Sequence, residues 1–328
     1  MRIKRRLPIL LGFLIFVAAV AAVVELRKHA PPEAARLLPG ADGFVYIDLK
    51  WMRRADIADH LPAVPHDPEY EQFIQATGFQ FERDLQEAAV AIHYASPETG
   101  SETRFSQILV AKIDGDKIRR YLKRLAASTD EYRSIPVYNI PLQNRILRVA
   151  ILGVDTVAAS NHNDPLVIRG IIDRSRKLAS PFGGPALLRQ FYKHVPLASL
   201  VWAIFRVNSQ KQPVNLTLPF SNPATIVASV RYLGAVHFKA EAFTRDEQAA
   251  EQLTSEVNSF MAIFRSAELS IAGKSPDPDT SKALDSLKVE QKKDRAVLTA
   301  VVPVELIRKV VSEVPAGLPA EVGPKPSK

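Results

Sequence analysis

The sequence predicts an α+β fold in which a mostly antiparallel sheet is packed against amphipathic helices. Three observations predict it. Segments such as residues 236–243 alternate apolar and polar side chains, which is the period of a half-buried strand. Segments such as residues 115–125 repeat apolar side chains every three or four positions, which is the period of a helix. Turn and cap residues such as Asp67-Pro68 separate these segments.

The first half of the chain contains three helix signals between strand-like runs. An Asp-Pro pair or an Asp-Gly-Asp turn precedes each helix, because an aspartate caps the free N–H groups and proline fits the first helical position. We expect helices after Asp67, Asp114 and Asp164, the first of them ending at Gly78. We expect strands over residues 43–49, 88–95, 105–112, 137–140, 146–152 and 156–160.

The second half repeats the same order of elements. We expect helices over residues 185–194, 246–265 and from Pro303, and strands over residues 198–207, 224–233, 235–243, 286–290 and 295–302. Residues 105–125 and 236–257 both read as strand, acidic turn and helix. We therefore predict two degenerate repeated modules, residues 41–185 and 186–314. The proline-rich tail 315–328 is predicted to be disordered.

The amino-terminal region predicts a membrane anchor. Leu7–Val24 is an uncharged apolar run of 18 residues, which as a helix would be about 27 Å long and nearly span a bilayer core. The tip, residues 1–6, holds four basic residues, so the positive-inside rule keeps it in the cytoplasm and places the body outside. The prediction is a single-pass inner-membrane protein. Residues 25–40, with three prolines, are expected to form an extended spacer.

Two alternatives remain for this region. A signal peptide cut near Ala19-Val20-Ala21 would leave a free periplasmic or secreted body, and a buried core helix would leave no anchor.

Charge and composition exclude several classes of function. The net charge is +8, but residues 1–28 hold six basic groups and one acidic group, so the remaining 300 residues carry only +3. This distribution does not fit a nucleic-acid-binding domain, which carries its basic patch on the folded body. The absence of cysteine excludes disulfides, thiolate metal sites and a cysteine nucleophile.

No catalytic motif is present. The chain lacks a P-loop, a dinucleotide-binding glycine motif, a nucleophile elbow and paired histidines at zinc-binding spacing. We therefore assign no catalytic, cofactor-binding or metal-binding residue and expect no cofactor. This favours a protein that is not an enzyme.

A few polar and aromatic residues have both a structural and a functional interpretation. His60 and His66 are either solvated loop residues or metal ligands, and His93 is expected to be packed. Residues 161–164 (Asn-His-Asn-Asp) are expected to cap a helix, with an ion site as the alternative. Residues 82–84 are expected to form a solvated face. Trp51 and Trp202 each accompany the first strand of a module, so core anchoring is expected and a ligand platform is the alternative.

Residues 38–54 (LPGADGFVYIDLKWMRR) and 76–92 (ATGFQFERDLQEAAVAI) resemble poorly characterised bacterial membrane-anchored exported proteins of unknown function. The resemblance covers residues 36–175, and Gly40 replaces the polar residue that the pattern has after Pro39. It implies an envelope location and no activity.

Three functions follow as hypotheses. The first is a tethered envelope protein that binds another protein or an envelope component. The second is a module that holds a lipid or another hydrophobic ligand in a cleft between the repeats. The third is a hydrolase with dispersed carboxylates, which would require two carboxylates close together in a cleft.

Overall fold

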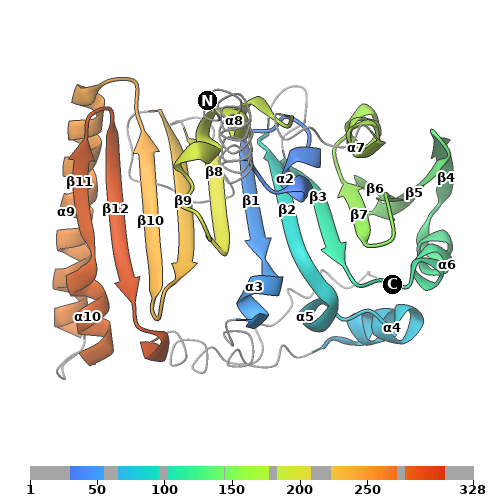
Figure 1. The fold of residues 1–328 in the computed structure, drawn as a ribbon, viewed down its shortest axis with the longest axis horizontal. Coiled ribbons are helices and arrows are strands. Elements are labelled where there is room, and N and C mark those ends of the chain that lie inside the picture. The colour runs from blue at the N-terminus through green and yellow to red at the C-terminus, as the bar shows by residue number, and fades with distance from the viewer. Residues whose placement is uncertain are drawn as a thin grey trace, which may run out of the picture.

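A computed structural model describes residues 30–54, 66–95, 102–143, 145–176, 183–207, 223–271 and 278–306. The strands of these residues form one antiparallel sheet of twelve, in the order β11-β12-β10-β9-β8-β1-β2-β3-β7-β6-β5-β4 (Figure 1). The predicted α+β class, with an antiparallel sheet and packed helices, is confirmed.

The sheet is continuous because the first strand of each half pairs with the other. β1 (Gly43–Asp48) and β8 (Val201–Val207) are antiparallel, with Val45 opposite Ala203. From β1 outward run β2 (Leu85–His93), β3 (Arg104–Ala111), β7 (Thr156–Ser160), β6 (Arg145–Ile151), β5 (Ile135–Leu142) and β4 (Ser128–Tyr132). From β8 outward run β9 (Ala224–Tyr232), β10 (Val236–Phe243), β12 (Arg295–Val302) and β11 (Lys288–Lys292).

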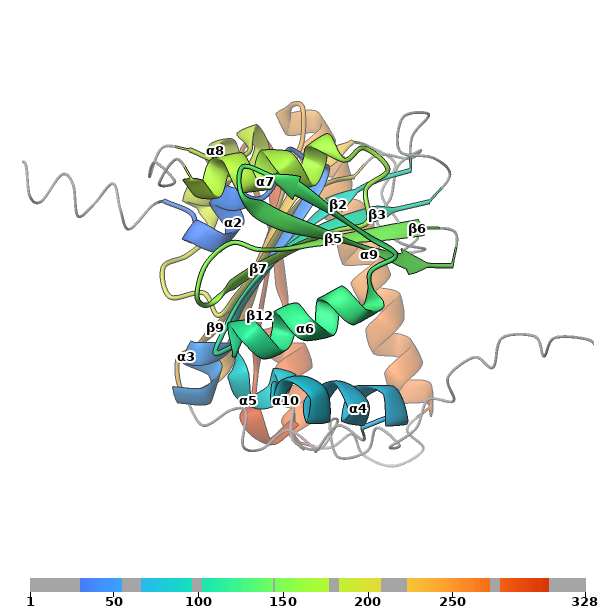
Figure 2. The same ribbon diagram turned by 90° about the vertical axis from the view of Figure 1, so that its right-hand side faces the viewer.

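Helices pack on both faces of the sheet (Figure 2). The front face, toward the viewer in Figure 1, carries α2 (Glu33–Leu37), α7 (Leu166–Arg176), α8 (Ala186–Phe191) and the 3₁₀ turn η2 (Tyr192–His194). The back face carries α4 (Pro68–Thr77), α6 (Gly115–Leu125), α9 (Glu247–Ile271) and α10 (Pro278–Ser286). Two short helices, α3 (Leu49–Arg54) and α5 (Phe81–Asp84), lie at strand ends.

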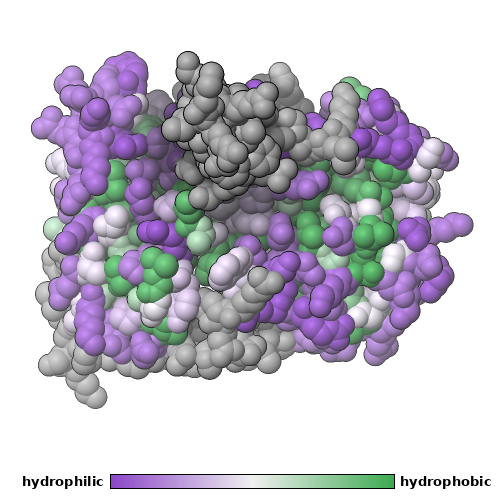
Figure 3. Space-filling model, viewed as in Figure 1, coloured by the Kyte–Doolittle hydropathy of each residue, from purple (hydrophilic) through white to green (hydrophobic). Residues whose placement is uncertain are grey.

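Strand alternation divides the apolar residues between two cores. In β7, Ala158 belongs to the front core and its neighbour Ala159 to the back core. The front core is the larger and includes Phe44, Trp202 and three isoleucines of α7. The back core joins α6 to the outer strands of the first half. Hydrophilic residues line both outer ends of the molecule (Figure 3).

The predicted helix boundaries are confirmed where capping residues marked them. The Asp67 carboxylate accepts a hydrogen bond from Tyr70 N at 2.7 Å, and Pro68 occupies the first turn of α4. Gly78 ends this helix with φ of 72°, a left-handed conformation that glycine adopts without strain. Asp114 caps α6 by accepting from the N–H groups of Asp116 and Lys117, both at 3.1 Å.

The expectation of an extended spacer over residues 25–40 is wrong for its second part. Glu33–Leu37 forms α2 directly after Pro32, which occupies the N-cap position. Ala35 is 0% exposed and Leu38 is 1% exposed, so this segment belongs to the front core. Prolines at a helix start are compatible with a helix that follows them.

Several sequence-predicted features lie outside the described residues. They are the segment 7–24 with its alternative cleavage site, the tail 315–328, and the last helix beyond residue 306. In the part of the chain that the structure describes, no helix is both long and apolar enough to span a bilayer.

Candidate functional site

A cavity of about 190 Å³ opens on the front face at the junction of the two halves. β1 and α3 form one side, and η2, residues 195–200 and β8 form the other. Its principal side chains are Tyr46, Asp48, Trp51, Tyr192, Ser199 and Trp202. We call this cavity the junction pocket.

Aromatic rings make up much of the junction pocket. Tyr46 and Trp202 are directly opposed across β1 and β8, and their rings stack with centroids 5.4 Å apart and an interplanar angle of 18°. The Tyr192 ring meets Trp202 at 5.2 Å and 69°. Tyr46 and Trp202 are buried, whereas Trp51 is 53% exposed. The pocket therefore has a buried aromatic floor and an exposed aromatic rim.

The two tryptophans differ in role. Core anchoring is confirmed for Trp202, which is 1% exposed, but is wrong for Trp51. β1 ends at Asp48 and the chain turns at once into α3, where the Asp48 Oδ1 accepts a hydrogen bond from Trp51 N at 2.9 Å. This turn carries Trp51 away from the sheet and onto the pocket rim.

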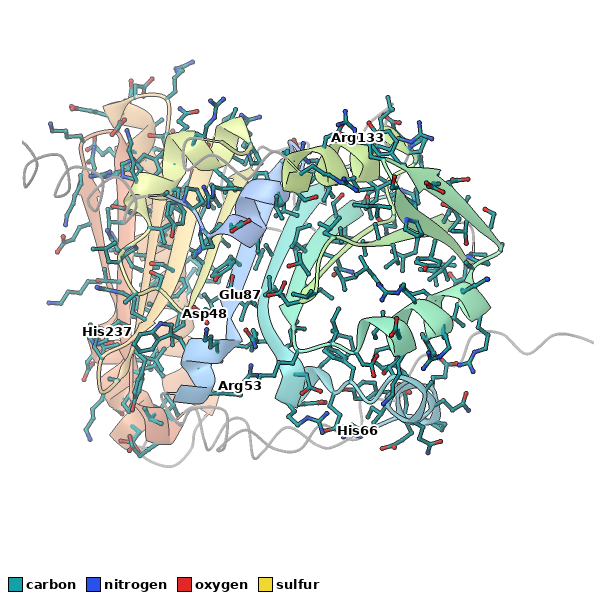
Figure 4. The ribbon with its side chains drawn as sticks, turned by 45° about the vertical axis from the view of Figure 1, so that its right-hand side comes forward. Asp48, Arg53, His66, Glu87, Arg133 and His237 are labelled. Carbon is teal, nitrogen blue, oxygen red and sulfur yellow. The ribbon has the colours of Figure 1, made fainter. Side chains whose placement is uncertain are left out.

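Two carboxylates lie side by side at this end of the sheet. Asp48 lines the pocket and is directly opposite Glu87 of β2 (Figure 4). Burial raises the pKa of Glu87; the hydrogen bond from the Tyr46 hydroxyl opposes this increase, and the Asp48 charge adds to it. Burial also raises the pKa of Tyr46 well above its usual range, with the two carboxylates contributing. The Tyr46 hydroxyl therefore keeps its proton at neutral pH and donates a hydrogen bond to Glu87.

Hydrogen bonds fix the loop over residues 195–200 at both of its ends. Ala198 has φ of 59°, in the left-handed region that L-residues with a side chain rarely adopt. The Ser199 hydroxyl donates to Pro196 O at 2.7 Å, and Asp48 N donates to Leu200 O at 2.8 Å. A strained residue at a pocket wall, fixed by neighbouring hydrogen bonds, is typical of a binding site.

His93 is packed, as predicted, within a buried polar chain. Its Nε2 lies 3.1 Å from Ser106 Oγ, which lies 2.9 Å from Ser160 Oγ. Burial lowers the pKa of His93 to about 4, with the His162 charge contributing. Ser106 is 0% exposed and Ser160 is 1% exposed, so neither hydroxyl is accessible to a substrate.

The polar cluster at residues 161–164 is confirmed as a turn and cap. Asp164 Oδ1 accepts from Leu166 N at 2.8 Å, and Asn161 Oδ1 accepts from Phe105 N at 2.7 Å. These oxygens are engaged by the backbone, which explains the cluster without an ion.

The remaining sequence candidates stay apart from the pocket. His66 contacts Glu71 at 2.8 Å at the surface, while its predicted partner His60 lies outside the described residues. The solvated face expected at residues 82–84 is wrong for Asp84, which is 8% exposed and accepts from Gln80 N at 2.9 Å. Within the described ranges, no group of three or more His, Cys, Asp or Glu side chains could hold a metal ion.

Sequence reasoning did not identify Tyr46, Tyr192 and Glu87. The alternation of Phe44, Tyr46 and Asp48 indicates that these three share a face of the strand. The partners of that face come from β2, β8 and η2, which lie far away in the sequence.

Comparison with known proteins yields a remote structural likeness. No family model and no curated protein matches the chain. Three crystal forms of TP0453 are similar in structure, with 9–11% sequence identity and TM-scores of 0.43–0.45. The likeness covers 86–87% of this chain and 98–99% of TP0453. At these values it does not establish a common family.

Proposed function

We propose that this protein is a non-enzymatic binding protein of the cell envelope, tethered by its amino-terminal segment, which holds a small ligand in the junction pocket. The observation that carries the proposal is the pocket itself. It combines a stacked aromatic floor, an exposed tryptophan at the rim and a carboxylate from the end of β1.

An exposed Trp51 is difficult to explain by stability alone. A tryptophan stabilises a fold by removing its large apolar surface from water. Trp51 keeps 53% of its surface exposed, while its backbone N–H is fixed by Asp48 at 2.9 Å. An aromatic side chain held at the mouth of a cavity is typical of a ligand contact.

The tether rests on the sequence of residues 1–28. The uncharged run Leu7–Val24 follows four basic residues, which supports a single membrane span with the body outside the cytoplasm. We keep the cleaved form as an alternative, in which the same body is free in the periplasm or secreted.

We also propose that the body is a degenerate duplication of residues 41–185 and 186–314. Three antiparallel strands lead away from the junction in each half, β1-β2-β3 and β8-β9-β10. In each half the third strand leads into a helix, α6 or α9, and a later strand returns beside it, β7 or β12. This common order supports two repeated modules with the junction pocket between them.

The two tryptophans allow a direct test, because the chain contains no others and both line the pocket. Full-length protein should be purified in a mild detergent, and small molecules released from it compared with those released from Trp51→Ala. We expect at least one compound that is enriched in the wild type and that changes the intrinsic tryptophan fluorescence when returned. An equal set of compounds from both proteins, none changing the fluorescence, would contradict the proposal.

A second candidate function, binding of a hydrophobic ligand, is favoured by the back face of the central strands. The helices of that face pack over outer strands, α6 on β5 and α9 on β11 and β12. The central strands present partly exposed side chains there, none of them charged. Three adjacent rows illustrate this: Val45 with Val90 and Ala203, Ile92 with Phe205 on either side of the buried Gly43, and Ile47 with Ala88 and Val201.

The occupant that suits this face is an acyl chain, because the three rows offer no charged partner and apolar burial is the available driving force. Native mass spectrometry of the full-length protein ejected from nanodiscs would detect a retained lipid. Phe205→Ser should reduce the retained fraction while Trp51→Ala should not. Equal retention by both variants would argue against the back face.

The hydrolase hypothesis gains no comparable support. Of the neighbouring pair Asp48 and Glu87, only Asp48 lines the pocket, so the geometry for acid and base on opposite sides of a substrate is not offered.

A further inference from the structure

We propose that the ligand of the junction pocket carries an organic ammonium group, held by the aromatic rings and by Asp48. This inference rests on the proposed function and specifies the chemistry of its ligand.

The aromatic content of the pocket suits a cation. The π-face of tryptophan or tyrosine attracts an ammonium group placed within about 6 Å of the ring centre, and quaternary ammonium ligands are commonly held in aromatic cages. Here Trp51 lies at the rim, the stacked pair of Tyr46 and Trp202 forms the floor, and Tyr192 meets Trp202 edge to face.

The charge of the pocket points the same way. Asp48 is an acidic side chain of its lining, and of the described residues that line it none is lysine or arginine. Asp48 also lies directly across the strand pair from Glu87. Two carboxylates in that arrangement repel each other, so a cation bound beside Asp48 relieves a repulsion that the fold contains. Lys50 also acts on Glu87 electrostatically, but it is exposed and does not line the pocket.

Asp48 is already positioned for this role. Its Oδ1 is fixed by the N–H of Trp51 at 2.9 Å. That contact orients the carboxylate and fixes the backbone of Trp51 beside it before a ligand arrives. Preorganisation of this kind lowers the entropic cost of binding.

The size of the cavity limits the ligand. A volume of about 190 Å³ is smaller than a drug-sized site. It suits a compact head such as choline or another small amine. The ammonium group could belong to a free amine or to a lipid headgroup, since the chemistry at the pocket is the same.

The test compares choline with 3,3-dimethylbutan-1-ol, which has the same shape but no charge. Binding to the full-length protein in maltoside micelles is measured by calorimetry and by tryptophan fluorescence. We expect choline to bind about tenfold or more tightly than the neutral analogue, because desolvated cation–π contacts and a carboxylate act only on the charge.

Matched variants connect the effect to the pocket. Asp48→Asn keeps an oxygen for the N–H of Trp51 but removes the charge, and should weaken choline binding about tenfold without changing binding of the neutral analogue. Trp51→Leu should weaken choline binding as well. Asp130→Asn removes an exposed carboxylate from β4 at the far edge of the sheet and should change neither.

Each outcome is decisive. Equal affinity for choline and its neutral analogue, or no effect of Asp48→Asn, overturns the ammonium proposal. If a co-purified compound binds and choline neither binds nor displaces it, the ammonium proposal fails while the proposed binding function stands. If choline binding is competed by phosphatidylcholine nanodiscs and not by phosphatidylglycerol nanodiscs, the proposal is supported with a lipid headgroup as the source. Choline binding that neither kind of nanodisc reduces assigns the group to a free amine.

Discussion

The buried His93 should make the protein lose stability as the pH falls through the range from about 6.5 to about 4. His93 is 6% exposed, and its Nε2 lies 3.1 Å from Ser106 Oγ. The centroids of the His93 and His162 rings are 4.9 Å apart. Burial, with a contribution from His162 and opposed by Asp42, holds the pKa of His93 at about 4. The folded protein therefore keeps this ring neutral while the unfolded chain takes up a proton.

The size of the effect follows from the two pKa values. A free histidine titrates near 6.5 and His93 near 4, and each pH unit between the two values is worth about 1.4 kcal/mol. Because the folded-state value is the lower one, the unfolded state binds more protons throughout this window. The free energy of unfolding should fall by about 3 kcal/mol between pH 6.5 and pH 4 on account of His93, and its contribution should level off below pH 4.

Urea unfolding followed by tryptophan fluorescence at a series of pH values would measure this slope. His93→Gln retains a hydrogen-bonding side chain beside Ser106 and should remove most of the slope. His66→Gln is the matched control. The hydrogen bond to Glu71 raises the pKa of the exposed His66, so its small contribution to the free energy of unfolding is lost as the pH rises, not as it falls. A full acid-side slope in His93→Gln, or its loss in His66→Gln, would show that a group other than His93 causes the pH dependence.

Three further changes have defined outcomes. Burial raises the pKa of Glu87, so Glu87→Gln should stabilise the protein at pH 7. This gain should disappear below about pH 4, where the carboxyl is protonated in both the folded and the unfolded state. Urea midpoints at pH 7 and below about pH 4 would measure the difference. Gly78 has φ of 72°, and a Cβ added there would meet only a side-chain atom at 3.7 Å. Gly78→Ala should therefore lower the free energy of unfolding by about 1 kcal/mol through backbone strain, whereas Gly153→Ala, whose Cβ would meet nothing within 4 Å, should lower it much less. Comparable losses in urea midpoint would contradict the conformational argument. Trp202→Ala should destabilise the fold by about 3–5 kcal/mol, because the Trp202 ring is buried. Trp51→Ala should destabilise it by less than about 1 kcal/mol, because the Trp51 ring is exposed. Similar shifts of the two melting temperatures would show that Trp51 is structural.

The elements that sequence predicted best are those whose boundaries are chemical. Asp67 and Gly78 mark both ends of α4, and Asp114 marks the start of α6, because caps act locally. The strand Ser128–Tyr132 was missed because its sequence, STDEY, has no apolar alternation. It is an edge strand that pairs only with β5 among the described strands. A polar edge discourages further pairing, and that same polarity hides the strand from a periodicity search.

The junction pocket was only partly predictable. Trp51 and Trp202 stood out in the sequence because each accompanies the first strand of a half. Their meeting with Tyr46 and Tyr192 depends on the pairing of β1 with β8 and on the placement of η2. The position of Asp48 opposite Glu87 depends in the same way on the pairing of β1 with β2. Local patterns do not encode such long-range registers.

The register of β1 against β8 determines both candidate surfaces at once. It sets Tyr46 opposite Trp202 on the front face and Val45 opposite Ala203 on the back. Because side chains alternate along a strand, a slip of one residue would exchange the aromatic floor and the apolar rows between the two faces. Each surface also requires both halves: the junction pocket takes Asp48 from the first and Trp202 from the second, and the back rows take Val45 from the first and Ala203 from the second. A single half would present one wall of the pocket to solvent, so the ligand binding that we propose for this site requires the joined protein.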